Sequence, residues 1–341
     1  MSFSQHCCAV LVAHLLILMP VQACLWDTDT IAMEKARFPE IADLISGNFP
    51  RHSKEFYQWR KTHCEAALAK GDQAPVVYDD LAVSQHKLGD HAAAIATMHS
   101  KEKVHPGLYE TCSNLGTFYI YANDLDQAEK WIQQALAINK NAHFGREQYQ
   151  LWLVQWVKSG KPDLGKETPI EQGLGFRGFA AFIVNKTGVG RGFVAFILGR
   201  AGGGGVSQEW KDGRAEAVRG ISGMMRFADH DNPLLLEALG DVLAAGIDTE
   251  NATLLAAQSY LLASRKSKAA AEKQRLWGLM AATGGSVDAY KPRDTMRTLD
   301  TAVADGTRLA AKVRLDEMDW IKAGKDVAAE FAAKYLKTSG K

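Results

Sequence analysis

Two stretches of the chain between residues 75 and 142 can be aligned on each other without a gap at a spacing of 34 residues. Small residues recur at this spacing, as Ala82 with Gly116 and Ala94 with Ala128. A period of this length indicates one antiparallel helix pair per repeat, because a single pair cannot bury its own apolar face and must stack on the next pair. The sequence therefore predicts an all-α fold of the α-solenoid kind.

The pattern within each stretch matches the tetratricopeptide repeat (TPR), which places aromatic, small, turn and proline residues at set positions. The matching residues of the first copy are Tyr78, Leu81, Ala82, Leu88, Gly89, Ala94, Met98 and Pro106. Those of the second copy are Leu115, Gly116, Tyr119, Ala128, Ile132 and Ala135. Gln85 and Lys101 depart from the pattern, which we interpret as a partial loss of packing in divergent repeats.

The rest of the chain is predicted to extend this stack. We expect N-terminal capping helices in 24–74, TPR-like repeats in 75–157, a Gly/Phe-rich insertion in 158–213 and C-terminal TPR-like helices in 214–338. The individual helices are expected at about 31–45, 53–70, 75–88, 91–104, 143–157, 215–227, 233–245, 252–264 and 269–281, with a final pair at 294–323 and 325–337. Alternating charges and alanines in the final pair are typical of a polar cap.

Residues 1–23 contain no Lys, Arg, Asp or Glu and carry an apolar run too short for a membrane span. They predict a signal peptide and hence export to the periplasm or cell envelope. Val21-Gln22-Ala23-Cys24 also resembles a lipobox, which makes Cys24 a lipidation candidate and the only expected link to a membrane. Plain secretion, lipidation and a retained helix all remain open.

The insertion contains a short internal duplication. Arg177-Gly-Phe-Ala-Ala-Phe-Ile-Val recurs as Arg191-Gly-Phe-Val-Ala-Phe-Ile-Leu, and each apolar run is too short to cross a bilayer. The two copies either pack into the solenoid or form an exposed apolar lip that touches a membrane or partner. We favour the packed arrangement.

Composition and missing motifs exclude several kinds of function. The formal net charge is only +1, which argues against a nucleic-acid partner. The chain has no nucleophile elbow, phosphate loop, dinucleotide pattern or Cys-x-x-Cys pair, so we predict no cofactor and no enzymatic activity. Of the cysteines beyond the signal, Cys64 and Cys112 either form a disulfide or, as we favour, are small core residues.

Three polar groups invite a catalytic or metal-binding interpretation. Asp27 and Asp29 are two residues apart, but capping of a helix explains them better than a cation site. Likewise, His230 precedes an ordinary helix start at Asn232. His143 and Glu147 share a helical face, and together with Arg146 they are predicted to form a hydrogen-bonded network, not a metal site.

The inner face of the repeats is the predicted binding surface. It lacks the Lys and Asn pattern that grips a C-terminal carboxylate, and its mixed acidic and aromatic character suits an extended peptide or a basic segment. The residues expected to contact a partner are Asp79, Asp80, Val83, Glu110, Ser113, Thr117, Tyr119 and Tyr121.

Several short motifs suggest a closer relationship, which extends over most of 24–260. They are Cys24-Leu-Trp-Asp, Tyr78-Asp-Asp-Leu-Ala-Val, Asn114-Leu-Gly-Thr, Ala142-His-Phe-Gly-Arg-Glu and Gly223-Met-Met-Arg-Phe. Through them the chain resembles a family of uncharacterised bacterial exported TPR proteins with a Cys-Leu-Trp-Asp motif after the signal peptide. The resemblance implies export and a helical-repeat fold but no particular activity, and the Phe-rich duplication departs from it.

These observations predict an exported TPR scaffold that binds a protein or peptide in the cell envelope without catalysis. The alternative is a metal-dependent or other enzyme that uses a polar cluster of Asp27, Asp29, His143, Arg146, Glu147 and His230. A purely structural envelope protein without a ligand in the groove is a third interpretation.

Overall fold

The computed structural model describes residues 25–34, 36, 38–140, 145–161, 178–187, 208–245, 250–284 and 292–336. Within these ranges the fold is all-α, as the sequence predicts, and the helices are joined by short turns and connections. No helix in the described ranges is both long and apolar enough to span a membrane.

The chain first forms two short helices where one interrupted helix was expected. They are α1 (Thr28–Glu34) and α2 (Ile41–Ser46), and Pro39 lies in the connection between them. Gly47 ends α2 with a left-handed φ of 73°, and a Cβ there would come within 2.3 Å of the His230 ring. Only glycine combines this backbone with such a close approach.

The next five helices follow the predicted pattern closely. They are α3 (Lys54–Ala69), α4 (Pro75–Lys87), α5 (His91–Val104), α6 (Tyr109–Tyr121) and α7 (Leu125–Ile138). Asp90 and Asp124, which are 34 residues apart in sequence, accept hydrogen bonds from backbone N–H groups in the first turns of α5 and α7. These caps satisfy donors that have no partner within the helix, and they set where each second helix of a pair begins.

Close packing within the second pair depends on a small residue. A Cβ placed on Gly116 in α6 would lie 2.6 Å from Cγ1 of Ile132 in α7. Ile132 and Ala128 are fully buried beside it, so the absence of a side chain lets the two helices approach. Cys64 and Cys112 are free and buried, as expected of small core residues.

Beyond the repeats, α8 (Arg146–Lys158) packs between α7 and α11. The expected insertion contains α9 (Gly178–Thr187), whose apolar residues Phe179 and Phe182 are buried. The first copy of the duplication is therefore packed against the body, whereas the second copy, 191–198, lies outside the described residues. The next helix, α11 (Gln208–Phe227), begins seven residues before the predicted start at 215.

The remaining helices are α12 (Pro233–Ala244), α13 (Glu250–Lys266), α14 (Ala270–Gly284), α15 (Pro292–Lys322) and α16 (Val327–Tyr335). Helix α12 begins at Pro233 because Asn232 caps it, accepting a hydrogen bond from Leu234 N at 2.8 Å. This start agrees with the sequence prediction.

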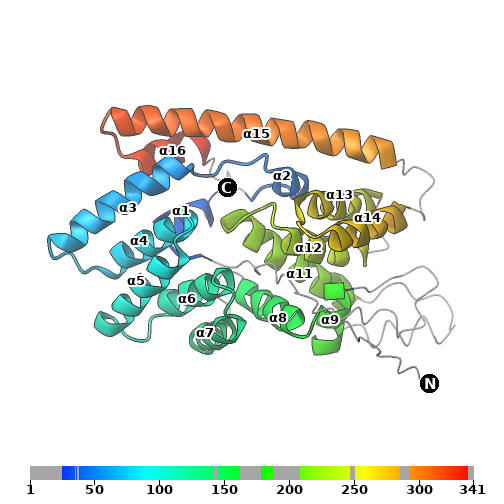
Figure 1. The fold of residues 1–341 in the computed structure, drawn as a ribbon, viewed down its shortest axis with the longest axis horizontal. Coiled ribbons are helices and arrows are strands. Elements are labelled where there is room, and N and C mark those ends of the chain that lie inside the picture. Colours follow the sequence, from blue (N-terminus) through cyan, green and yellow to red (C-terminus); the bar gives the residue numbers. More distant parts are fainter. Residues whose placement is uncertain are drawn as a thin grey trace, which may run out of the picture.

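The helices α3 to α8 and α11 to α14 form two groups with α1 and α2 between them, and α15 runs along one edge of both groups (Figure 1). Helix α15 contacts α3 and α2 as well as α13, so it connects the first group to the last. Helix α15, which was expected to be part of a polar cap at the C-terminal end, thus also contacts the N-terminal helices. Its 31 residues make this reach possible, since an α-helix rises about 1.5 Å per residue.

Candidate functional site

The inner face of α4 and α6, called here the groove, is covered by the start of the same chain. The covering stretch is the N-terminal segment, defined as residues 25–34. Leu25 is 1% exposed and packs in a small apolar core with the groove residues Tyr78, Ala82, Val83, Leu115 and Phe118. The predicted binding surface is therefore occupied within the chain itself.

Asn114 holds the main chain of the N-terminal segment. Its Oδ1 accepts a hydrogen bond from Trp26 N at 2.9 Å, and its Nδ2 donates to Trp26 O at 2.9 Å. One carboxamide thus pairs with both backbone polar atoms of a residue, as a neighbouring β-strand would. The contact is made to the backbone, so it does not depend on which side chain residue 26 carries.

Side-chain contacts add specificity at the same place. The Trp26 indole meets the Tyr109 ring edge to face at 5.8 Å. Two residues further along the segment, Thr28 donates hydrogen bonds from its backbone N and its Oγ1 to Asp80, each at 2.9 Å. The groove therefore contacts the segment through apolar, aromatic and polar groups in turn.

A buried ion pair sits beneath Asn114. The Nζ of Lys101 lies 2.7 Å from both carboxylate oxygens of Asp79, and Lys101 is fully buried. Asp79 also accepts a hydrogen bond from Asn114 at 3.2 Å, so the pair orients the amide that grips Trp26. Lys101 is thus not the loss of packing that the repeat pattern suggested, because its ammonium is paired and its stem is covered.

Arg60 of α3 binds two acidic residues of the N-terminal segment, Asp27 and Asp29. Its Nη2 lies 2.7 Å from Asp27, its Nη1 contacts Asp29, and its Nε donates to Ser84 at 2.8 Å. Asp27 also caps α1 by accepting from Thr30 N at 2.7 Å, which confirms the capping interpretation. Burial opposes ionisation of Asp29, but Arg60 and His52 outweigh it and lower the pKa of Asp29 to about 2.

His52 extends this network to the last two helices. Its Nδ1 lies 2.6 Å from Glu317 of α15, its Nε2 lies 3.6 Å from Asp29, and its ring stacks on Phe56 with centroids 3.8 Å apart. Phe331 of α16 covers the ring with centroids 3.9 Å apart. Burial by itself lowers the pKa of His52, yet the two carboxylates raise it above the ordinary value.

Seven of the eight predicted lining residues fall into two sets. Asp79, Asp80, Val83, Ser113 and Thr117 lie on the covered helix faces, and all but Asp80 are buried. The side chains of Tyr119 and Tyr121, both half-buried, turn elsewhere: the Tyr119 hydroxyl is 2.9 Å from His99, and that of Tyr121 is 3.4 Å from Asp229. Glu110, the eighth predicted residue, belongs to neither set and is also half-buried.

The described polar residues of the enzyme alternative have different partners. Asp27 and Asp29 bind Arg60, whereas Arg146 pairs with Glu34 and lies over the Phe227 ring at 4.6 Å. Glu147 accepts a hydrogen bond from Tyr109.

His230 packs edge to face on Phe49 at 5.7 Å. Its neighbour Asp231 binds Lys266 at 2.5 Å. His143 and Cys24 lie outside the described residues. Within the ranges that the structure describes, no three His, Cys, Asp or Glu side chains are grouped to hold a metal ion.

Sequence reasoning did not identify Asn114, Arg60, His52 or Glu317 as part of this site. One signal was available for Arg60, which stands between Phe56 and Cys64 at helical spacing and so interrupts an apolar stripe. A single cation in such a stripe predicts a buried acidic partner.

The sequence was compared with models of protein families and with curated proteins, and neither comparison gives a match. The case for function therefore depends on the geometry of the groove.

Proposed function

We propose that this protein is an exported, non-catalytic scaffold of TPR-like repeats that binds an extended peptide segment of a partner protein in the groove. The N-terminal segment is then an internal occupant that fills the groove until a partner displaces it. The observation that carries the proposal is the paired hydrogen bonding of Asn114 to the backbone of Trp26.

Main-chain pairing of this kind is how peptide-binding modules gain affinity, while neighbouring pockets select side chains. In the groove, an apolar pocket takes Leu25, the Tyr109 ring takes Trp26, and Arg60 takes the carboxylate of Asp27. This order favours a partner peptide with an apolar residue, an aromatic residue and an acidic residue in succession. Of the two partners that the sequence left open, an extended peptide and a basic segment, this argues against the basic one, since Arg60 would repel it.

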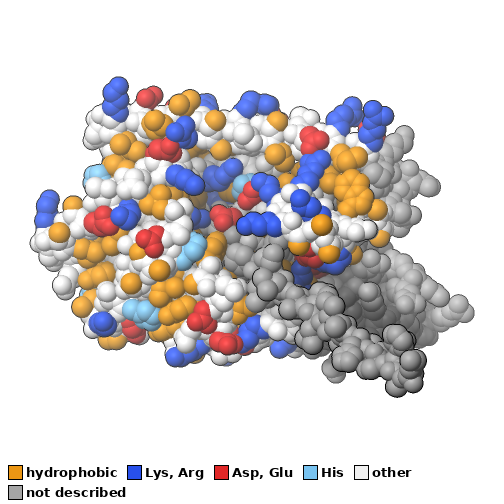
Figure 2. Space-filling view, viewed as in Figure 1, with side chains coloured by type: hydrophobic (Ala, Val, Ile, Leu, Met, Phe, Trp, Pro, Cys, Tyr) orange, Lys and Arg blue, Asp and Glu red, His pale blue; other side chains and the backbone are white. Residues whose placement is uncertain are grey.

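The surface supports a protein partner over a nucleic acid. Acidic and basic side chains are interspersed among apolar ones on the face shown in Figure 2. This mixture agrees with the formal net charge of +1 and differs from the basic stripe of a phosphate-binding protein.

Export and lipidation remain part of the proposal. Cys24 directly precedes the buried Leu25 in the sequence, so lipidation of Cys24 would attach the start of the N-terminal segment to a membrane. Incorporation of labelled palmitate into the wild type but not into Cys24→Ser would support lipidation. Equal incorporation into both would refute it.

A peptide-exchange experiment tests the groove. A fluorescent peptide with the sequence of residues 25–34 is added to the chain without its signal, and binding is followed by anisotropy. The wild type should bind weakly, because its own segment competes at an effective concentration in the millimolar range. Trp26→Ala should bind the peptide more tightly, since the internal occupant is weakened.

A peptide with a methylated backbone nitrogen at its tryptophan provides the matched control. Tested against Trp26→Ala, it leaves the internal occupant unchanged but cannot donate to Asn114, and its affinity should be lower than that of the unmodified peptide by roughly tenfold, the loss that corresponds to about 1.4 kcal/mol. No binding of the unmodified peptide by a folded Trp26→Ala protein would contradict the proposal. Equal binding of the two peptides would show that Asn114 does not recognise the peptide backbone.

A further inference from the structure

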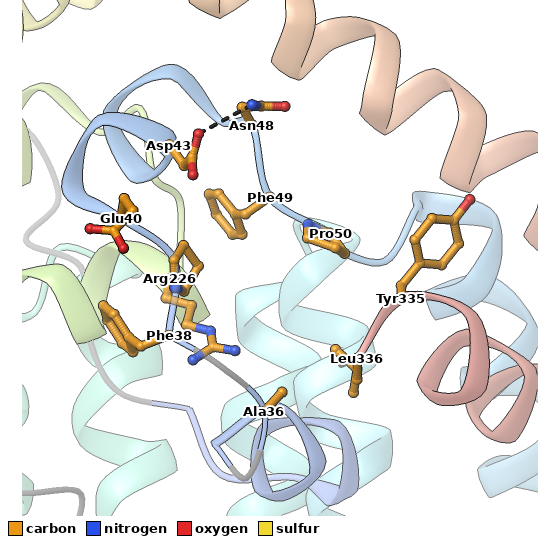
Figure 3. Close-up of a pocket in the computed structure, with 11 residues that line it drawn as sticks. Ala36, Phe38, Glu40, Asp43, Asn48, Phe49, Pro50, Arg226, Tyr335 and Leu336 are labelled. Carbon is orange, nitrogen blue, oxygen red and sulfur yellow. Dashed lines mark hydrogen bonds between the residues drawn. The ribbon is translucent and has the colours of Figure 1, made fainter. Parts of the chain in front are cut away.

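A cavity lies between the α1–α2 connection, α11 and the end of α16, and it shares no lining residue with the groove. Its volume is about 290 Å³. Figure 3 shows Arg226 beside Phe38 at one side, with Tyr335 and Leu336 at the other. The volume is close to the lower end of the range of about 300–1,000 Å³ for small-molecule sites, which favours a ligand no larger than a dipeptide.

A buried cation lines this cavity. Arg226 is 8% exposed, donates from Nη2 to Met33 O at 2.8 Å, and lies over the rings of Phe38 at 5.0 Å and Phe227 at 5.3 Å. These contacts hold the guanidinium plane in place. A fixed, planar guanidinium is well suited to bind a carboxylate through two parallel hydrogen bonds.

The charge around Arg226 favours an anion. Arg146 lies over the same Phe227 ring at 4.6 Å, and the carboxylate that acts on Arg226, Glu34, is paired with Arg146. Burial and the neighbouring Arg146 lower the pKa of Arg226 to about 10.

The remaining lining is apolar at the walls and acidic at one rim. Phe38, which is 40% exposed, stands with Phe49, Pro50 and Leu336 around the cavity. The acidic rim residues are Glu40 and Asp43, and the Asp43 carboxylate accepts a hydrogen bond from Asn48 at 3.1 Å. A ligand here therefore meets a cation, apolar rings and carboxylates.

We propose that this cavity binds a short zwitterion with an apolar body, namely an apolar α-amino acid or a dipeptide. Its carboxylate would pair with Arg226, its apolar side chain would contact Phe38 and Phe49, and its ammonium group would face Glu40 and Asp43. A simple anion would be repelled by the rim, and a simple cation by Arg226. The cavity shares no lining residue with the groove, but Arg226 also contacts Met33 of the N-terminal segment.

Isothermal titration calorimetry on the full chain without its signal tests this site. The probes are L-phenylalanine and glycyl-L-phenylalanine, each compared with a form whose carboxylate is amidated and a form whose amine is acetylated. At least one zwitterion should bind, and blocking either end should weaken it by about tenfold or more, since each block removes a charge-assisted contact. The stronger of the two zwitterions identifies the free amino acid or the dipeptide as the ligand.

Variants at the accessible lining separate binding from folding. Phe38→Ala and Glu40→Gln change exposed side chains, so both should keep the thermal midpoint while losing about fivefold or more in affinity. Arg265→Gln, which changes an exposed arginine on α13, should bind like the wild type. The proposal is overturned if no zwitterion binds, if the blocked forms bind equally well, or if Phe38→Ala and Glu40→Gln both retain wild-type affinity.

Discussion

Two segments of the chain pack against helices of the body, and they do so by different means. The N-terminal segment lies on α4 and α6, where Asn114, Asp80 and Arg60 bind its backbone and its carboxylates. Helix α9 lies on α12 and α8, where it is held mainly by burial of its apolar side chains.

Asp241 of α12 supplies a polar anchor for α9. Asp241 accepts hydrogen bonds from Phe179 N at 2.9 Å and from the Tyr260 hydroxyl at 2.7 Å. A Cβ on Gly178, whose φ is 48°, would come within 2.3 Å of this carboxylate. Burial raises the pKa of Asp241 to about 8, so the carboxyl group is held in a strongly desolvated place.

These two kinds of contact distinguish a docked segment, which is held by polar contacts, from a core element, which is held by apolar burial. Apolar burial such as that of Phe179 is non-directional, and it is lost only when the surrounding core opens. Polar contacts to a backbone can be exchanged for the same contacts to another peptide. We therefore expect the N-terminal segment to be displaceable and α9 to behave as part of the core.

Replacement of Arg60 should have the largest effect. Arg60→Met leaves the buried carboxylates of Asp27 and Asp29 without their cation, and it should destabilise the protein by about 3–5 kcal/mol, as expected for breaking a buried pair. Urea denaturation measures the change. Arg265→Met, at an exposed pair with Asp300, is the control and should cost under about 1 kcal/mol. Similar losses in both variants would contradict the role given to Arg60.

Removal of the Phe179 ring should cost slightly less and should affect only the α9 side. Phe179→Ala leaves a cavity in a fully buried position, with a typical loss of about 3–4 kcal/mol. In the folded variant, binding of the peptide of residues 25–34 should be unchanged, because Phe179 does not touch the groove. A change in peptide affinity would show that the two segments are coupled.

Replacement of His52 should produce a smaller loss that depends on pH. The pKa of His52 is raised in the folded protein, so its contribution is complete below its unfolded value of about 6.5 and is lost as the pH rises through the folded value. Asp29 acts oppositely: its pKa is lowered to about 2, so its contribution is lost as the pH falls from about 4 towards 2.

The free energy of unfolding of the wild type and His52→Gln should therefore differ by about 2 kcal/mol at pH 5.5, from lost hydrogen bonds to charged groups, and by less at pH 8.5. His63→Gln, which changes an exposed ring, controls for the loss of a histidine and should show no such trend. A difference that stays constant between the two pH values would rule out the proposed charge on His52.

Local signals predicted much of this structure. The repeat period located α4 to α7, and Asn232 marked a helix start that the structure confirms. Each of these features is decided by residues close together in sequence. The path of α15 was not predictable, because a stripe of apolar residues does not say which distant helix will cover it.

The sequence also did not predict that the N-terminal segment would occupy the groove. Asn114 and Trp26 are 88 residues apart, and Trp26 lies in a part of the sequence without repeat signals. We predicted that the inner face binds an extended peptide of a partner, whereas the segment that lies there belongs to this chain and is helical from Thr28, and nothing in the repeat pattern indicated this. Val83, which was predicted to line the groove, is buried in the same apolar core as Leu25 of the N-terminal segment.

Hydrogen exchange at the N-terminal segment tests the central claim most directly. The amides of Trp26 and Thr28 donate to Asn114 and Asp80, so their exchange reports release of the segment. In native conditions, mass spectrometry should show residues 25–34 exchanging through a local opening that is more frequent than the opening of α6 or α9. Asn114→Ala should accelerate exchange of the segment by roughly tenfold and leave α9 unchanged. Exchange of the segment only together with α6, at the rate of global unfolding, would contradict the claim that it is a displaceable occupant of the groove.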